Sequence, residues 1–237
     1  MKSTRARLDT FISRHGEMSK REVRHCLLQQ QIMVDGLIAT AMDQIIHQFS
    51  VVSLQGKIIQ QNTPTYIVLN KPKGVVSSTT DKNHTTVIDI IDGPRKEELH
   101  IVGRLDFNTT GLLLLTNDGR WSRRLSLPEN NIQKKYRVTL EQAITTEYAT
   151  TFVQGIYFRH ENITTRPAEL EVLSPHIVEL TICEGRYHQV KRMFGYFQNK
   201  VLELHRLAVG NLPLDPKLSL GASRSLTELE VKDIFPS

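Results

Sequence analysis

The stretch "GRLDFNTTGLLLLTNDG", Gly103–Gly119, decides the fold of this chain. Its four consecutive leucines, Leu112–Leu115, form an apolar run that is too short for a helix and predicts a strand buried on both faces. The run ends in the turn sequence Asn117–Gly119. The carboxylate of Asp106 stands at the edge of this segment, two residues after Arg104, although carboxylates avoid cores unless a partner holds them. The stretch therefore predicts a central strand with a charged turn at its start.

The segments on either side of this strand are mostly strands, with a few helices among them. Alternating or short apolar runs predict strands, and apolar residues at helical spacing predict a helix. The strands are expected at 66–70, at 134–140, and as a pair over 168–182 around Ser174-Pro175, and the helix is expected at 187–197. Because strands and helices do not alternate regularly, the sequence predicts an α+β fold with a mainly antiparallel mixed sheet.

The first sixty residues predict a small separate unit. Ser19, followed by Glu22, is the start signal of a helix, and Asp35-Gly36 between two apolar runs is a hairpin signal. The polar residues 61–65 then predict a linker. The chain is therefore expected to divide into residues 1–60, this linker, and a larger unit over residues 66–237.

The positive charge of the chain is concentrated at its start. The 237 residues carry a formal net charge of +5, and the pI is about 9.2. Within residues 1–24, seven basic residues against three acidic ones give +4 of that total. The basic residues are Lys2, Arg5, Arg7, Arg14, Lys20, Arg21 and Arg24. They form either a solvated helix face or a surface that binds the phosphates of a nucleic acid.

Composition and missing motifs exclude several classes of protein. The two cysteines, Cys26 and Cys183, are far apart in the sequence, which argues against a disulfide framework and fits a reducing cytoplasm. No apolar run has the length of a membrane span, and the basic N-terminus has no apolar signal region. The sequence also has no phosphate-binding loop, no dinucleotide-binding glycines and no hydrolase serine motif.

Three segments carry candidate chemistry, each with a plainer alternative. Asp106 is either a turn aspartate that caps backbone amides or a carboxylate kept ionised in a pocket by a cation. Tyr136 is either a core residue or an aromatic surface for a ligand. The segment at 186–192 is either the wet face of an amphipathic helix or a group of cations that reaches into a pocket. Its basic residues are Arg186, His188, Lys191 and Arg192, with His188 and Arg192 expected on one helix face. His188 has no second ligand at metal-binding spacing, so no metal site is expected.

Taken together, these segments resemble the RsuA family of ribosomal RNA pseudouridine synthases. "GRLDFNTTGLLLLTNDG" resembles the family's aspartate motif, "KKYRV" its tyrosine motif and "EGRYHQVKRMF" its third motif, in the same order. The N-terminal stretch resembles the S4-type RNA-binding module that precedes the catalytic domain in this family. The resemblance covers nearly the whole chain.

The resemblance implies a function and a role for each candidate residue. It implies isomerisation of uridine in RNA without a metal or cofactor, with Asp106 as nucleophile, Tyr136 against the flipped-out base and Lys191 paired with Asp106. RNA contacts are expected from both units: from Arg104, Arg186, His188 and Arg192, and from the N-terminal Arg5, Arg7, Lys20, Arg21 and Arg24.

The third motif, "RYHQVKRMF", resembles the branch that acts on 16S rRNA of the small ribosomal subunit. The expected enzyme is a cytoplasmic monomer that acts on 16S rRNA, free or in a partly assembled particle. Two alternatives remain: a large-subunit (23S) rRNA pseudouridine synthase of the same family, and a catalytically silent RNA-binding protein of ribosome assembly.

Overall fold

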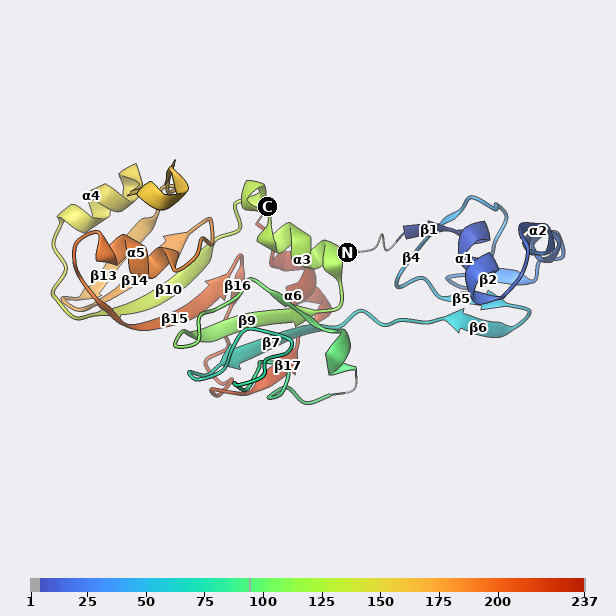
Figure 1. Ribbon diagram of the computed structural model, residues 1–237, viewed down its shortest axis with the longest axis horizontal. Coiled ribbons are helices and arrows are strands. Elements are labelled where there is room, and N and C mark those ends of the chain that lie inside the picture. The colour runs from blue at the N-terminus through green and yellow to red at the C-terminus, as the bar shows by residue number, and fades with distance from the viewer. Residues whose placement is uncertain (1–4, 94, 237) are drawn as a thin grey trace. The chain divides into compact units, whose positions relative to one another are not determined.

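The computed structural model describes residues 5–93 and 95–236 of the chain (Figure 1). Packing divides the chain into two compact units, of which the first ends at Pro64 and the second begins at Thr65. The division falls inside the polar stretch at 61–65. Each unit has a hydrophobic core of its own, so the two are described separately. Lys2, one of the basic residues counted at the start of the chain, lies outside the described residues.

The first unit combines two short helices with small antiparallel sheets. Its elements are β1 (Arg5–Arg7), α1 (Leu8–His15), α2 (Lys20–Leu28), β2 (Ile32–Val34), β3 (Leu37–Ile38), β4 (Ile45–His47), β5 (Val52–Leu54) and β6 (Lys57–Gln60). Four strands form a sheet in the order β3-β2-β5-β6, and β1 pairs with β4. Leu8 and Ile12 of α1 pack with Val23 of α2 in the core between the helices and the strands.

Both local signals in the first unit are confirmed. The Ser19 hydroxyl accepts a hydrogen bond from the Glu22 amide at 3.3 Å, and the Glu22 carboxylate accepts one from the Ser19 amide at 2.7 Å, so the capping box starts α2. Asp35 and Gly36 have φ angles of 53° and 81° between β2 and β3, the left-handed backbone that a tight hairpin turn requires.

The second unit is built on one large mixed sheet. The strands of this unit are β7 (Tyr66–Lys71), β8 (His100–Val102), β9 (Thr110–Thr116), β10 (Lys134–Leu140), β11 (Tyr157–Phe158), β12 (Ile163–Thr164), β13 (Glu169–Ser174), β14 (Ile177–Ile182), β15 (Val201–Val209), β16 (Leu212–Pro213) and β17 (Ser223–Ser225). β11 and β12 form a separate two-stranded sheet. The main order is β13-β14-β10-β15-β9-β7-β17, with β8 beside β9 and β16 beside β15. β9 and β15 run parallel, and the other pairs are antiparallel, so the expected α+β fold with a mainly antiparallel mixed sheet is confirmed.

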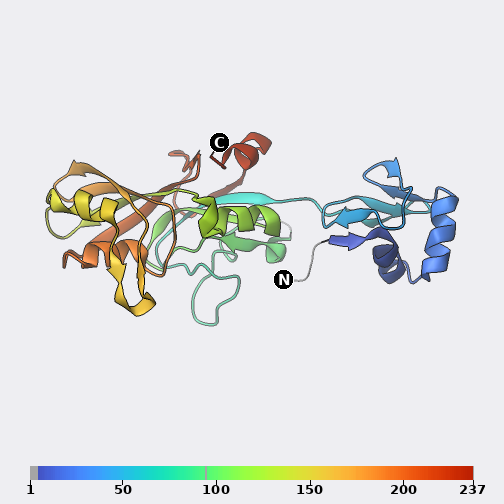
Figure 2. The ribbon, with the colours of Figure 1, turned by 90° about the horizontal axis from the view of Figure 1, so that it is seen from above.

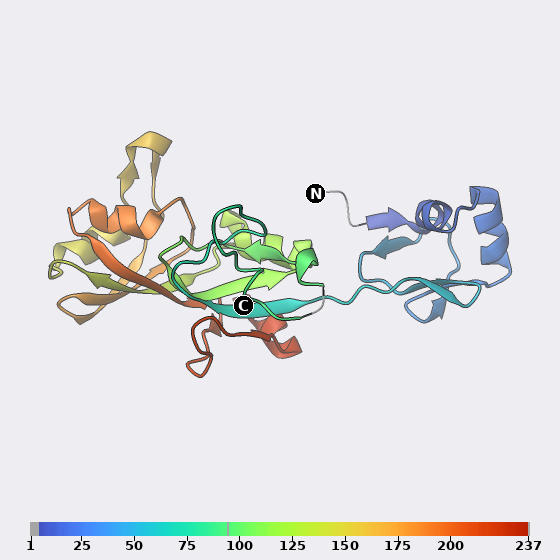
Figure 3. The ribbon, with the colours of Figure 1, turned by 60° about the horizontal axis from the view of Figure 1, so that its bottom comes forward.

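Short helices cover this sheet. They are η1 (Lys96–Glu98), α3 (Gly119–Ser126), η2 (Pro128–Asn130), α4 (Glu147–Gln154), η3 (Arg159–Glu161), α5 (Gln189–Gly195) and α6 (Glu228–Asp233). Between β7 and residue 93 the chain forms a long loop without a helix or strand (Figure 2), and Figure 3 shows α4 and α5 at the same end of the sheet. None of the helices in the described residues has the length and apolar character needed to cross a membrane.

The leucine run is the central strand that the sequence predicts. All four leucines of β9 are completely buried, and they alternate between two cores. Leu113 and Leu115 join the core that contains α4 and α5, whereas Leu112 and Leu114 join the core that contains α3. A strand with apolar partners on both faces needs this unbroken apolar run, because successive side chains point to opposite faces.

The helix expected at 187–197 is shorter than the sequence predicts. α5 begins at Gln189, and His188 before it has a left-handed backbone with φ 48°. His188 and Arg192 therefore do not lie one turn apart on a common helix face. Their side chains face different partners, Asp106 and Glu161 respectively.

Candidate active site

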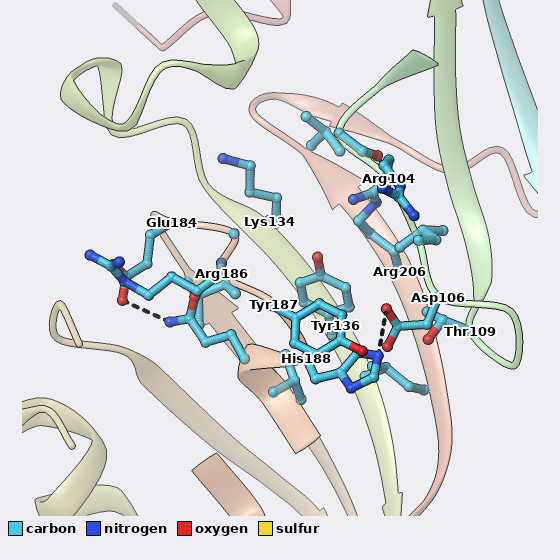
Figure 4. A pocket seen from close by; sticks show the side chains of 18 of the residues that line it. Arg104, Asp106, Thr109, Lys134, Tyr136, Glu184, Arg186, Tyr187, His188 and Arg206 are labelled. Carbon is cyan, nitrogen blue, oxygen red and sulfur yellow. Dashed lines mark hydrogen bonds and ion pairs between the residues drawn. The ribbon is translucent and has the colours of Figure 1, made fainter. Parts of the chain in front are cut away.

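A cavity of about 820 Å³ opens in the second unit where the turn before β9 meets β10, β15 and the segment that leads into α5. Figure 4 shows Asp106 and Arg104 on one wall, Tyr136 and Lys134 on β10, and the Arg186–His188 segment opposite the turn. The sequence motifs that lie far apart in the chain are thus brought to one place. The cavity also receives Arg206 from β15, which the sequence reasoning did not single out.

Two nitrogen groups face the Asp106 carboxylate. Lys191 Nζ donates to Oδ2 at 3.0 Å, and His188 Nε2 lies 3.4 Å from Oδ1. The side chains of Asp106 and Lys191 are 30% and 35% exposed, so the pair is shielded from solvent but open to the cavity. His188 itself has the left-handed backbone before α5, and its ring faces the carboxylate. The Tyr187 ring stacks on the His188 ring, with centroids 3.9 Å apart.

The turn that carries Asp106 is held from beneath by Lys71. This lysine at the end of β7 is completely buried, and the three N–H donors of its ammonium group are shared among four backbone carbonyls. The acceptors are Pro72 O at 3.0 Å, Asp106 O at 3.1 Å, Phe107 O at 3.3 Å and Thr109 O at 3.0 Å. Burial lowers the pKa of Lys71 to about 8; the negative charge of Asp106 opposes this shift, and the positive charge of Arg206 adds to it.

Ser77 fixes the residue before Asp106. Its hydroxyl donates to Leu105 O at 2.7 Å and accepts from the Leu105 amide at 3.1 Å. Together with Lys71, this contact leaves the backbone on both sides of Asp106 anchored. In the sequence, Lys71 is a cation directly after a predicted buried strand. This local pattern alone does not connect Lys71 with Asp106, which comes thirty-five residues later.

Arg206 braces the other side of the same turn. It is 3% exposed, and it donates to Leu112 O at 2.7 Å and to Gly103 O at 3.0 Å. The close parallel contact of β15 with β9 needs glycine at position 111, where φ is 103° and a Cβ atom would lie 2.3 Å from Arg206 O. Gly111 therefore allows Arg206 to reach the backbone that precedes Asp106.

Tyr136 forms part of the cavity floor. It lies on β10 between Leu180 of β14 and Arg206 of β15, and it is 7% exposed. Lys134, two residues earlier on the same face of the strand, also lines the cavity. A strand in the middle of a sheet is a rigid support for such an aromatic surface.

Arg104 is exposed at the cavity wall. Arg186 and Arg192, in contrast, form ion pairs with carboxylates. Arg186 lies 3.0 Å from Glu184 and 3.4 Å from Glu161. Arg192 pairs with Glu161 and packs over the Phe158 ring, with its guanidinium carbon 3.6 Å from the ring centroid. These two arginines thus join α5 to neighbouring segments, and neither contacts Asp106.

The N-terminal candidates Arg5, Arg7, Lys20, Arg21 and Arg24 belong to the first unit and are not part of this cavity. Two of them face a carboxylate that is 3% exposed: Arg7 and Lys20 lie 3.1 and 3.7 Å from Asp9. Hydrogen bonding to Arg7 lowers the pKa of Asp9. Arg21 and Arg24 are exposed on α2.

The described residues contain no cluster of three or more His, Cys, Asp or Glu side chains that could hold a metal ion. What the cavity offers is a carboxylate on an anchored turn, a cation paired with it, an aromatic wall and a surplus of basic side chains. This set suits covalent or proton-transfer chemistry on a flat, polar ring that belongs to a polyanion.

Comparison with known proteins agrees with this description. Residues 65–196 match the family model described as RNA pseudouridylate synthase. A relative from Pseudomonas aeruginosa, the ribosomal small subunit pseudouridine synthase A, is 46% identical over 226 residues, which cover 95% of this chain and 98% of the relative. The protein of that name from Escherichia coli is 42% identical over 229 residues, 96% of this chain and 99% of the relative. A crystal structure of a pseudouridylate synthase superposes with a TM-score of 0.70 at 38% identity, covering 96% of this chain and 99% of the other.

The fold and the cavity define an RNA-modifying isomerase. The chain belongs to the RNA pseudouridylate synthase family. It converts uridine in RNA to pseudouridine, moving the ribose carbon C1′ from N1 to C5 of uracil.

Proposed function

We propose that the target uridine lies in 16S rRNA of the small ribosomal subunit, in free RNA or in a partly assembled particle. The support is the identity of 41–46%, over nearly the full length, to relatives named ribosomal small subunit pseudouridine synthase A. The protein acts as a monomer in the cytoplasm, where this RNA is made and assembled.

Asp106 is the nucleophile in this proposal. The isomerisation breaks the bond between C1′ and N1, turns the base and joins C1′ to C5, and the net change moves one proton from C5 to N1. A carboxylate can assist by adding to the uracil ring or by taking a proton from the ribose. The observation that carries the assignment is the ion pair of 3.0 Å between Asp106 and Lys191 inside a cavity that also presents Tyr136.

The other residues hold the flipped-out nucleotide. Tyr136 offers its ring to the base, which has to leave the RNA stack before Asp106 can reach it. Lys191 and His188 orient the carboxylate, and Arg104 contacts the RNA at the cavity wall. Arg186 and Arg192 support the segment that carries His188 and Lys191, and their exposed edges contact RNA.

The test of the target is to incubate the purified chain with 16S rRNA, 23S rRNA and small-subunit particles, and then to map pseudouridine in each. We expect new pseudouridine in 16S rRNA and none in 23S rRNA. Pseudouridine in 23S rRNA alone would overturn the 16S target in favour of the large-subunit alternative. A chain that modifies none of these RNAs would contradict ribosomal RNA as its substrate.

The ion pair predicts a defined loss of rate when Lys191 is removed. In Lys191→Met, the Asp106 carboxylate loses its partner at 3.0 Å and keeps His188 at 3.4 Å, so its position and charge are less well fixed. A hydrogen bond between charged groups contributes about 1.5–3 kcal/mol, and we expect a fall in single-turnover rate of about 10–100-fold. Lys200→Met, which changes an exposed lysine of the same region, is the control and should keep the wild-type rate. Equal rates for both variants would contradict a role for Lys191 at the carboxylate.

The first unit acts in this proposal as an S4-like RNA-binding module. Lys20, Arg21 and Arg24 lie on or at the start of α2, and Arg5 and Arg7 lie on β1. Arg21 and Arg24 are the sharper choice for a test, because Lys20 and Arg7 already face Asp9. These cations hold phosphates and add affinity rather than chemistry.

Replacing Arg21 and Arg24 together by Gln should weaken RNA binding and leave the rate at saturating RNA unchanged. Each lost phosphate contact lowers the slope of log affinity against log salt by about 0.7–0.9. We therefore expect the slope to fall by about 1.5 in a salt titration of binding. An unchanged slope would mean that this helix face is only solvated surface.

A further inference from the structure

Lys134 is a cation that the described part of the cavity leaves without a carboxylate or hydrogen-bond partner. It lines the cavity from β10, on the same face as Tyr136 and only partly exposed. Its neighbour Lys135 points to the other face and lies 2.6 Å from Glu179. The two adjacent lysines therefore differ: Lys135 forms an ion pair, whereas no carboxylate of the described residues lies within ion-pair distance of Lys134.

The carboxylates around the cavity are already engaged. Asp106 pairs with Lys191, Glu161 pairs with Arg192 and Arg186, and Glu184 accepts from Arg186, from the Gln189 side chain and from the Arg166 amide. Six basic side chains and three carboxylates line the cavity, which gives a formal surplus of +3. The six are Arg104, Lys134, Arg166, Arg186, Lys191 and Arg206. A cavity with this surplus favours an anionic group of the ligand.

We propose that Lys134 binds a backbone phosphate of the RNA at the target uridine, while the base of that nucleotide lies against Tyr136. This inference rests on the proposed function, because it assigns one substrate contact within that site. Residues 134 and 136 are about 7 Å apart along the strand, which is comparable with the separation of a base from its own phosphate. A lysine is a compact point charge that suits a phosphate oxygen.

The surroundings of Lys134 explain why an anion would be bound there firmly. Burial, together with the positive charges of Arg206 and Arg166, lowers the pKa of Lys134 to about 8, and Cys183 and Glu184 oppose the shift. A phosphate beside the ammonium group favours the charged form. RNA binding and protonation of Lys134 are therefore coupled, so affinity should be constant below pH 8 and should fall as the pH rises above it.

The experiment compares three variants on an RNA that the wild-type protein converts. Lys134→Gln removes the charge, Lys134→Arg keeps a charge that does not titrate, and Lys135→Gln is the matched control on the opposite face. Glu179 retains Arg137 at 2.8 Å in that control. We expect Lys134→Gln to weaken RNA binding about tenfold and to lower the salt slope by about 0.7, with Lys135→Gln unchanged.

Two further measurements locate the contact. Between pH 6.5 and 9, wild-type affinity should fall on the alkaline side, and Lys134→Arg should show a smaller fall. Ionisation of uridine or of Lys71 affects both proteins alike, so the difference between them reports Lys134. An RNA with a neutral methylphosphonate at the target uridine should bind the wild type less tightly than the unmodified RNA does. The affinity for this modified RNA should not fall further when Lys134 is replaced by Gln.

Equal affinity and equal salt slope for Lys134→Gln and the wild type would overturn the phosphate contact. Additive losses of affinity from Lys134→Gln and from the methylphosphonate would also overturn it. If the two groups contact each other, removing either one already loses the whole contact, so removing both should cost no more than removing one. Failure of the wild-type protein to convert the 16S RNA counts instead against the proposed target. That failure is visible before any variant is compared.

Discussion

Asp106→Asn should abolish pseudouridine formation while the chain folds and binds RNA as before. The amide has nearly the shape of the carboxylate but neither its charge nor its nucleophilicity. We expect the single-turnover rate to fall by about 10⁴-fold or more, as for the loss of other enzyme nucleophiles. RNA affinity should be equal or tighter, because Lys191 loses its internal counter-ion and becomes free for phosphate.

The matched control is Asp92→Asn, which makes the same chemical change at an exposed position of the same unit. It should retain the wild-type rate. Measurement of pseudouridine in single-turnover reactions, together with RNA binding and thermal unfolding, separates loss of chemistry from loss of fold. Turnover by Asp106→Asn within tenfold of the wild type would show that the carboxylate is not the reacting group.

The sequence could predict the parts of this molecule whose signals are local. The leucine run from Leu112 to Leu115 predicts a strand buried on both faces, and the structure has it in the middle of the sheet. Ser19 and Asp35-Gly36 predict a helix start and a hairpin because capping boxes and tight turns depend on a few adjacent residues. The same locality explains one error: helical spacing continues through 187–197, but the left-handed backbone at His188 starts the helix only at Gln189.

The residues that hold the site in place could not be predicted in this way. Lys71 and Arg206 act on the Asp106 turn through backbone carbonyls that are 35 to 103 residues away in the sequence. Any segment offers carbonyl groups, so a bond to a carbonyl leaves no residue pattern at the acceptor. The family resemblance pointed to Asp106 and Lys191 because both lie in motifs that can be recognised in the sequence. Lys71 is in a sequence that is typical of an ordinary strand end, so nothing singled it out.

Lys71→Met should therefore impair both the stability of the second unit and its catalytic rate. The methionine fills the space of the lysine stem but cannot donate to the four carbonyls. Asp106 O and Phe107 O keep the amides of Thr109 and Gly74 as donors, while Pro72 O and Thr109 O lose the ammonium group. A buried acceptor left without its donor costs about 1–3 kcal/mol, so we expect a loss of about 3 kcal/mol in the free energy of unfolding. For a domain of this size, that loss corresponds to a fall in Tm of about 6–12 °C.

The catalytic effect follows from the same contacts, because Lys71 holds the backbone of Asp106 and of the two residues that follow it. A displacement of about 1 Å in a reacting group can lower a rate about 100-fold, and we expect a loss of that size at a temperature where Lys71→Met is still folded. Lys73→Met is the control: Lys73 lies two residues further along, and its pair with Glu203 at 3.4 Å joins two exposed side chains. Such a pair contributes at most about 1 kcal/mol, so Tm and rate should stay close to the wild type. If Lys71→Met loses stability but keeps the wild-type rate when folded, Lys71 supports the fold without positioning Asp106. If Tm and rate are both unchanged, the four hydrogen bonds of Lys71 support neither.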